Sequence, residues 1–512
     1  MELRAGARDH GTPLVPYWNE CVGAGRANEG LRAAWQEHLR MAVRECGFRY
    51  VRFHGLFHDD MFVTRTFQYV NELFDRLLDA GIRPFVELGF SPGELARERA
   101  TTFWWGAHGS PPTDLAAWAD LVRRLIRNCV ARYGVGEVRQ WYFEVWNEPN
   151  LYPFFRGTRS EYFELYKVTA LAVKEVDPLL RVGGPATSNF VPDGRFAGEL
   201  EDNSRHAAVT GAADLDALEW RPVWVEEFLD YCHREGLPVD FVSCHPFPTD
   251  RALDGHGQGA TYTRGASATA TDLRTLNAIV EASPYPEAEI HLTEWSSTPS
   301  PRDHTHDHLQ AATFIVRSVL ESIGLADSLA YRTFTDVFEE SGAGDTSFHG
   351  GFGLINYQGI PKPAFHTYRF LNCLGDTLLA RTPGAAVTRR GDRLVALACH
   401  YPPEMPSSVP LSAPGRETAE RTLALGRPEP LVLELTGLPA GAVFTVETLD
   451  TEHGNPLATW AKMGRPEPLS REDAAELRAV APLREVVHAS ADGVLRLARP
   501  IQPWSVVLVE ER

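Results

Sequence analysis

Stretches with helical periodicity and short strand-like runs alternate from residue 14 to residue 372 of this chain. An amphipathic stretch at 31–43, for example, precedes an apolar run at 48–53. A helix between two strands returns the chain to the same edge of a sheet, so such strands pair in parallel. With a first strand near 14–21 the pattern contains eight strands, which predicts an α/β fold, a closed (β/α)8 TIM barrel over residues 14–372. The other expected helices are 63–80, 115–132, 162–176, 223–234, 273–282 and 309–323, and the other strands are 84–88, 141–146, 182–185, 239–245, 289–294 and 328–335.

Beyond residue 375 the sequence changes to short alternating runs with turn residues between them. Runs of this kind, such as 394–398 and 443–448, are typical of antiparallel sheets. We therefore predict a smaller C-terminal antiparallel β-sandwich over residues 375–512. The stretch 402–430 is rich in Pro, Ser and Gly, which predicts a loop within it.

The charge of the chain limits its partners. Lys and Arg number 50 against 68 Asp and Glu, which gives a net charge of −18 at pH 7 and a sequence pI near 5.5. No run of basic residues stands out. We therefore expect neither nucleic acid nor a membrane as a partner.

Cysteine usage and apolar runs bear on the compartment. The seven cysteines are scattered, and their odd number cannot form a complete disulfide framework. The first ten residues are polar and lack the apolar core of a signal peptide. No run approaches the roughly 18 apolar residues of a membrane-spanning helix. These features predict a cytoplasmic location.

A glutamate stands where one predicted strand becomes a loop. The run Trp141-Tyr-Phe-Glu-Val-Trp146 alternates and is rich in aromatic residues, and Pro149 ends it. Glu148 is thus expected at the C-terminal end of a barrel strand, where such barrels carry their active sites. Aromatic residues nearby, among them Phe154, offer a surface on which sugar rings stack. The alternative is a solvated glutamate in a loop.

Hydrolysis of a glycoside requires a second carboxyl group that faces the anomeric carbon. The run Ile290-His-Leu-Thr-Glu294 also alternates and also ends in a carboxylate at a strand-to-loop change. Glu294 follows Glu148 by 146 residues, which leaves room for about three βα units of the usual length. Glu148 and Glu294 are therefore the predicted catalytic pair.

With these motifs the sequence resembles glycoside hydrolase family 39, the β-xylosidases and α-L-iduronidases, and is closest to the bacterial β-xylosidases. The resemblance runs from about residue 17 to residue 370 and implies a (β/α)8 barrel that retains anomeric configuration. It implies general acid/base catalysis by Glu148, a hydrogen bond from Asn147 to the sugar 2-hydroxyl, and nucleophilic attack by Glu294. In that family N-terminal residues often join the β domain, so residues 1–13 can belong to it. The segments that carry the resemblance are 20–26, 50–56, 84–90, 103–105, 146–149, 245, 293–295, 335–340 and 348–353.

Polar residues at other strand ends are candidates for contact with substrate. Arg52 and His54 alternate with apolar residues, which places both on the interior side of one strand. Arg52 can either brace Glu294 and Asn147 or contact the sugar. His245 ends a strand in the same way, and the resemblance implies a contact with substrate.

Three further positions can shape the sugar site. Trp105, in Phe103-Trp-Trp105, is either core or a stacking wall, and its place in a loop favours the wall. By resemblance Glu339 and Glu340 bind hydroxyls of the non-reducing sugar, because a carboxylate accepts two adjacent hydroxyl donors. The alternative for this pair is a solvated acidic turn.

Two positions depart from the β-xylosidase pattern. Arg332 stands where those enzymes carry Trp, and Phe247 stands where an aromatic residue with a hydroxyl is expected. The change at Phe247 removes a hydrogen bond near the nucleophile. Arg332 either pairs with a local carboxylate or reads the carboxylate of a uronate, and the acidic residues around it favour the pairing.

One segment has the residue types of a metal site. Asp303-His304-Thr-His306-Asp-His308 offers three imidazoles at alternate positions, but the segment precedes a helix for which Asp307 is a natural N-cap. We expect no metal and no organic cofactor.

The carboxylate pair predicts a glycosidase with a small carbohydrate as substrate, and the resemblance implies a retaining exo-glycosidase that removes terminal β-D-xylosyl residues from xylo-oligosaccharides or aryl xylosides. The negative net charge favours neutral sugars. The alternatives are the same residues acting on an α-L-arabinoside, a β-galactoside or an α-L-iduronide, or a catalytically silent carbohydrate-binding protein. The presence of both glutamates argues against the silent protein. The sequence predicts no oligomeric state.

Overall fold

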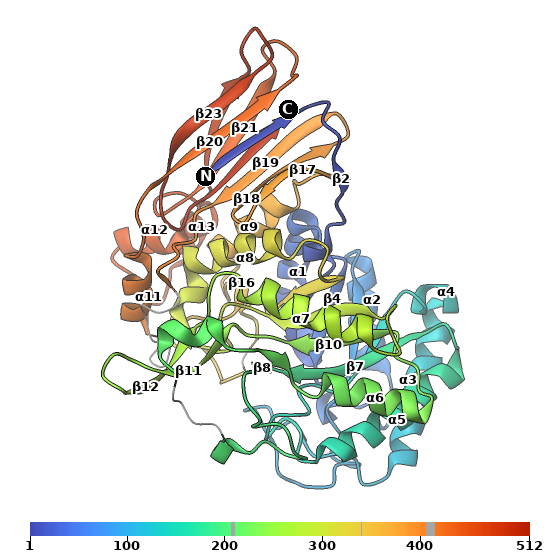
Figure 1. Ribbon diagram of the computed structural model, residues 1–512. Coiled ribbons are helices and arrows are strands. Elements are labelled where there is room, and N and C mark those ends of the chain that lie inside the picture. Colours follow the sequence, from blue (N-terminus) through green and yellow to red (C-terminus); the bar gives the residue numbers. More distant parts are fainter. Residues whose placement is uncertain (206–209, 339, 406–414) are drawn as a thin grey trace.

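The computed structural model describes residues 1–205, 210–338, 340–405 and 415–512. Eight parallel strands form a barrel, which closes where β14 pairs with β3 through Tyr331 and Val22. Helices surround the barrel (Figure 1), so the predicted (β/α)8 fold is confirmed. The barrel strands are β3 (Cys21–Arg26), β4 (Tyr50–His54), β5 (Arg83–Leu88), β6 (Tyr142–Val145), β7 (Arg181–Ser188), β10 (Phe241–His245), β13 (Glu289–Trp295) and β14 (Ser328–Tyr331). The helices around them are α1 (Ala33–Cys46), α2 (Gln68–Asp79), α3 (Leu115–Tyr133), α4 (Val135–Val138), α5 (Arg159–Val176), α6 (Val225–Glu235), α7 (Ala268–Ala282), α8 (Leu309–Glu321) and α9 (Pro363–Leu371).

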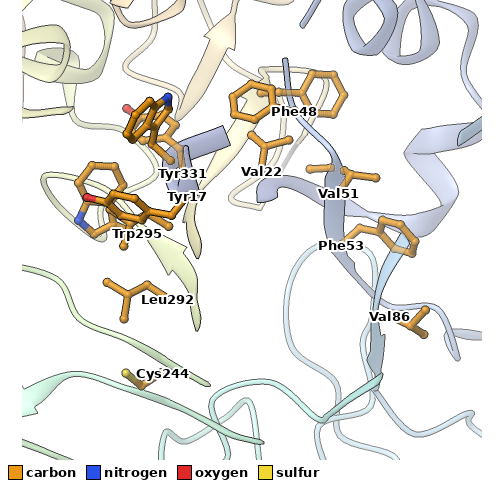
Figure 2. Packing of buried hydrophobic residues seen from close by; sticks show 14 of the residues in the cluster. Tyr17, Val22, Phe48, Val51, Phe53, Val86, Cys244, Leu292, Trp295 and Tyr331 are labelled. Atoms are coloured by element: carbon orange, nitrogen blue, oxygen red, sulfur yellow. The ribbon is translucent and has the colours of Figure 1, made fainter. Parts of the chain in front are cut away.

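Each barrel strand presents alternate residues to two different environments. Val51 and Phe53 of β4 belong to a large apolar cluster that also contains helix residues such as Leu39 and Leu73. Figure 2 shows Val51 and Phe53 within this cluster, together with side chains from neighbouring strands such as Val86. The intervening residues of β4 face the barrel interior.

Aromatic side chains fill the N-terminal end of the barrel interior. Tyr50, Phe85, Tyr142 and Phe241 form a separate buried cluster with Cys21 and Ala330. The rings of Phe85 and Tyr142 stack with centroids 4.7 Å apart and planes 15° apart. This layer closes one end of the barrel, and the polar residues lie beyond it, toward the C-terminal ends of the strands.

The first and last barrel strands differ from the prediction. Residues Tyr17–Asn19 form a 3₁₀ helix, and the first strand begins only at Cys21. Pro13 and Pro16 explain the difference, because proline has no N–H to donate within a central strand. The predicted strand 328–335 is split, since β14 ends at Tyr331 and β15 (Thr333–Thr335) pairs with β16 (Gly353–Ile355).

Closure of the barrel requires a glycine in β3. A Cβ atom on Gly23 would lie 2.0 Å from the carbonyl oxygen of Arg332, so only glycine allows the two strands to approach here.

Two short antiparallel strand pairs lie in the loops that follow other barrel strands. They are β8 (Phe190–Val191) with β9 (Arg221–Pro222), and β11 (Thr249–Leu253) with β12 (Gly259–Thr263).

Two sheets form the second unit of the chain. They share an apolar core that includes Leu3, Val387, Leu433 and Phe444, as expected of a sandwich. One sheet contains β1 (Glu2–Gly6), β20 (Glu429–Thr436) and β23 (Leu495–Ile501). The other contains β2 (Thr12–Pro13), β17 (Thr377–Thr382), β18 (Ala385–Arg390), β19 (Arg393–Cys399), β24 (Val506–Glu511), β21 (Val443–Leu449) and β22 (Leu483–His488).

Most pairs in these sheets are antiparallel, but β1 pairs with β20 in parallel. The N-terminal segment thus contributes β1 and β2 to the second unit, beside the strands drawn in orange and red in Figure 1. The prediction of a loop over 402–430 is wrong in part, because residues Arg416–Leu423 form helix α11. Residues 406–414 of that stretch lie outside the described residues. Two further helices are α12 (Pro456–Lys462) and α13 (Arg471–Arg478).

No helix within the described ranges is both long enough and apolar enough to cross a membrane. All seven cysteines carry free thiols.

Candidate active site

The polar residues predicted from the sequence meet at the C-terminal ends of the barrel strands. Glu148 follows β6, Glu294 lies near the end of β13, and His245 ends β10. One carboxylate oxygen from each glutamate and one ring nitrogen of His245 all lie within 4.8 Å of one another. The structure therefore brings together two carboxylates that are 146 residues apart in the sequence.

The backbone around Glu148 is held in an uncommon conformation. Trp146 and Glu148 have φ angles of 72° and 46°, in the left-handed region that side-chain-bearing residues seldom adopt. The backbone N–H of Glu148 donates to the carbonyl oxygen of Ala186 at 2.9 Å. The indole N–H of Trp146 donates to the backbone carbonyl oxygen of Phe154 at 3.1 Å. Conformations of this kind persist only where the surroundings enforce them, and they cluster at active sites.

Three cationic side chains surround the Glu294 carboxylate. Arg52 Nη1 donates to Oε1 at 2.9 Å, His54 Nε2 lies 3.0 Å from the same oxygen, and Arg332 contacts Oε2. Burial acts to raise the pKa of Glu294, but Arg332, His245 and His54 outweigh it and hold that pKa well below the usual value. Glu294 is therefore ionised, the form that a nucleophile requires.

Arg52 braces several groups of the site at once. Its Nε donates to Glu144 Oε2 at 2.6 Å and its Nη2 donates to Asn147 Oδ1 at 2.9 Å, in addition to the contact with Glu294. Nη2 also lies 3.1 Å from Glu87. The bracing role, one of the two considered for Arg52, agrees with these contacts.

His54 is held between two carboxylates. Its Nδ1 lies 2.6 Å from Glu87 Oε2, opposite the contact of Nε2 with Glu294. Burial acts to lower the pKa of His54, but Glu87 and Glu294 outweigh it and raise the pKa to about 10. His54 is thus charged at neutral pH and donates from both ring nitrogens.

Arg332 pairs with local carboxylates. It contacts Glu294 on one side, and its Nη2 donates to Glu340 Oε2 at 2.6 Å on the other. The guanidinium carbon lies 4.7 Å from the ring centroid of Phe352.

Phe247, the other departure from the family pattern, is buried. Glu339 lies outside the described residues.

Buried charged side chains hold the loop that carries Phe352 in place. Lys362 Nζ lies 2.6 Å from both Asp307 and Asp336. The N–H groups of Gly350 and Gly353 donate to these same carboxylates at 2.7 and 2.6 Å. This cluster fixes the segment that packs against Arg332.

Aromatic rings from the loops that follow β5 and β6 stack on one another. The ring of Phe103 stacks between those of Trp105 and Phe154, at centroid distances of 5.2 and 5.3 Å. Arg26 lies 5.0 Å from the centroid of Trp105, where a cation and a ring face attract each other. Trp105 and Phe154, which the sequence predicts as sugar-stacking residues, therefore belong to one stack.

The segment 303–308 does not bring its three imidazoles together as a group that could hold a metal ion. Asp303 caps a 3₁₀ helix, Asp307 pairs with Lys362, and the N-cap of α8 is His308, so the prediction of Asp307 as its N-cap is wrong. Among the described residues, the one group with the composition of a metal site is Glu148, His245 and Glu294. Guanidinium groups already neutralise Glu294 in that group, so its donor set does not fit a metal centre.

Three buried residues of the site were not predicted. Glu87, Glu144 and Thr293 contact Arg52, His54 or His245 from the barrel interior. A signal for the two glutamates was present, because each alternates with apolar residues on its strand as Arg52 does. Thr293 carries no such signal, because a threonine is ordinary in a strand.

Known proteins share this architecture. The family model for glycosyl hydrolases family 39 matches residues 1–496. A β-xylosidase of Caldicellulosiruptor saccharolyticus is 35% identical over 90% of this chain and 87% of its own length. One from Geobacillus stearothermophilus is 34% identical over 96% of this chain and 92% of its own. The crystal structure of a monomeric β-xylosidase from Caulobacter crescentus CB15 matches with a TM-score of 0.84 and 33% identity over 99% of each chain. The chain therefore belongs to glycosyl hydrolases family 39 and is a glycoside hydrolase.

Proposed function

We propose that this enzyme removes terminal β-D-xylosyl residues from xylo-oligosaccharides or aryl xylosides by a retaining double displacement. The observation that carries the proposal is the distance between the two carboxylates, with one oxygen of each within 4.8 Å of the other. Retaining enzymes place their carboxyl groups about 5–5.5 Å apart, whereas inverting enzymes need about 6.5–9.5 Å to admit a water molecule. The β-xylosidases that the chain resembles support the choice of sugar.

In the first step Glu148 gives its proton to the glycosidic oxygen while Glu294 attacks the anomeric carbon. The bond to the leaving oxygen breaks, an ester to Glu294 forms, and the leaving group departs as an alcohol. In the second step Glu148 takes a proton from water, whose oxygen attacks the anomeric carbon. The sugar is released with its original configuration, Glu294 returns as a carboxylate, and Glu148 is again protonated.

The cations around Glu294 serve both steps. They keep it ionised before the attack, and they stabilise the carboxylate that leaves when water breaks the ester. The same positive groups stabilise the negative charge of the Glu294 carboxylate at the start and at the end of the catalytic cycle. This arrangement lowers the basicity of Glu294 and makes it a good leaving group.

The charges of the site favour a neutral sugar. Arg332, the residue that could read a uronate, is already paired with Glu294 and Glu340. A uronate would have to displace one of these carboxylates from a buried guanidinium, which is unfavourable. The departures at Phe247 and Arg332 support a second candidate, which is the same chemistry on another neutral sugar such as an α-L-arabinoside or a β-galactoside.

A panel of nitrophenyl glycosides tests the proposal. We expect the highest kcat/KM on the β-D-xyloside and negligible release from the α-L-iduronide. Higher activity on the arabinoside or galactoside would favour the second candidate, and release from none of the sugars would contradict both. The variant Glu148→Ala should hydrolyse activated aryl xylosides only, and added azide should give a β-xylosyl azide, since azide needs no general base. An α-xylosyl azide would contradict the retaining mechanism.

A further inference from the structure

A chain of buried contacts leads from Glu148 into the barrel interior. Glu148 Oε1 lies 2.9 Å from His245 Nδ1, and His245 Nε2 lies 3.0 Å from Thr293 Oγ1. The Thr293 hydroxyl in turn donates to Glu144 Oε1 at 2.7 Å. His245, Thr293 and Glu144 are all 0% exposed, so these contacts are shielded from bulk solvent.

The direction of each hydrogen bond follows from the charge of Glu144. Arg52 donates to the other oxygen of Glu144 at 2.6 Å, and an ionised carboxylate only accepts hydrogen bonds. The single hydroxyl proton of Thr293 is therefore committed to Glu144. The Thr293 oxygen can then only accept from His245, which requires a proton on Nε2.

We propose that Thr293 and Glu144 are positioning residues that fix the Nε2–H tautomer of His245, so that His245 Nδ1 and Glu148 share one exchangeable proton. The inference rests on the role of Glu148 in the proposed function and adds to it. His245 then acts through Glu148. Both of its ring nitrogens contact protein groups, which leaves no polar atom for a sugar hydroxyl, so this role replaces the substrate contact expected from the sequence.

The pair of Glu148 and His245 loses one proton in the first step and regains one in the second. Before the first step the pair of Glu148 and His245 holds one proton between Oε1 and Nδ1. That proton passes to the leaving oxygen through Glu148, which leaves a carboxylate facing the lone pair of Nδ1. Two acceptors at this distance repel, and the repulsion favours removal of a proton from water in the second step. Thr293 and Glu144 neither gain nor lose a proton.

Other charged groups face this pair from neighbouring strands. Glu294 Oε2 lies 4.0 Å from His245 Nδ1, and Arg332 contacts that same oxygen. Arg52 contacts Glu144 and Glu294. These positive and negative groups are paired with one another. The Thr293 hydroxyl is neutral, so its removal breaks the chain of contacts without changing the charge of the site.

Replacement of that hydroxyl tests the inference. Thr293→Val keeps the shape of the side chain but frees His245 to adopt the Nδ1–H tautomer, which donates to the Glu148 carboxylate and weakens the acid. We expect kcat/KM to fall about 10²-fold on xylobiose, whose departure needs the acid, and by less than about threefold on 2,4-dinitrophenyl xyloside, whose departure does not. The basic limb of the pH profile on xylobiose should move down by about one pH unit. Thr293→Ser should recover most of the loss.

A purely structural role would lower activity on both substrates alike and would leave the pH profile in place, and either result would overturn the inference. A second measurement needs no substitution at Thr293. In protein with ¹⁵N-labelled histidine, the His245 signals, identified by their loss in His245→Gln, should show Nε2 protonated across the active pH range. A neutral ring protonated on Nδ1 would overturn the inference. Absence of turnover on every glycoside would contradict the proposed function instead, and the NMR result would still decide the tautomer.

Discussion

Two layers of side chains fill the interior of the same barrel strands, and they are stabilised in different ways. Toward the N-terminal end lie Tyr50, Phe85 and Tyr142, and two residues further along each strand lie Arg52, Glu87 and Glu144. All six are buried. In the first layer the stability comes from removal of apolar surface and from ring packing.

In the second layer burial by itself is unfavourable, and the charges are tolerated because each one contacts an opposite charge. Arg52 alone contacts Glu87, Glu144 and Glu294. The aromatic layer can therefore lose one member with a local effect, whereas the charged layer is stable only as a set.

Loss of Arg52 should have the largest effect. Arg52→Met leaves three buried carboxylates without their shared cation, and we expect the free energy of unfolding to fall by about 3–5 kcal/mol. Urea denaturation measures the change. Arg123→Met, which removes a partly exposed ion pair with Glu175, is the matched control and should change it by less than about 1 kcal/mol. Equal effects of the two substitutions would contradict the account.

The charge of His54 predicts a dependence of stability on pH. Its pKa is raised to about 10, above the value of about 6.5 in an unfolded chain. The added stability is therefore fully present below about pH 6.5 and is lost as the pH rises through about 10. We expect the stability difference between wild type and His54→Gln to shrink over this range in urea denaturation. A difference independent of pH would show that His54 stays neutral.

The aromatic layer should respond in stability alone. Phe85→Leu removes part of a ring that packs against Tyr142 and Phe241, and we expect a loss of about 1–2 kcal/mol in the free energy of unfolding. The value of kcat/KM should stay within about twofold of wild type, because the charged layer keeps its own contacts. A large loss of activity in folded Phe85→Leu would show that the two layers are coupled.

The smallest effect is expected at the edge of the aromatic layer. The Tyr142 hydroxyl donates to Glu289 Oε2 at 2.6 Å, and the Glu289 side chain is 37% exposed. Water can replace this bond, so Tyr142→Phe should lower the free energy of unfolding by about 1 kcal/mol or less. A loss above about 3 kcal/mol would place this hydroxyl among the essential contacts of the barrel.

Some parts of the site could be predicted from the sequence because their signals are local. Glu148 and Glu294 each end an alternating run, and Arg52 and His54 share the interior side of one strand. The eight-strand barrel follows from the order of helices and strands for the same reason.

Other parts depend on how distant strands align. The contact between His245 and Thr293 requires the parallel pairing of β10 with β13, and no local pattern fixes that register. The pairing of Arg332 with Glu294 depends on the break between β14 and β15, where an unbroken strand was predicted. Helix α11 was missed because a segment rich in Pro, Ser and Gly precedes it.

We propose that Glu294 forms the covalent bond to the sugar. A 2-deoxy-2-fluoro-xyloside with an activated leaving group slows the second step, so the enzyme should accumulate a glycosyl ester. Mass spectrometry of the intact protein should show the addition of one fluoroxylosyl group, and peptide mapping should place it on Glu294, with Glu294→Ala unlabelled. Labelling of another residue, or turnover of the reagent with inverted configuration, would contradict the account.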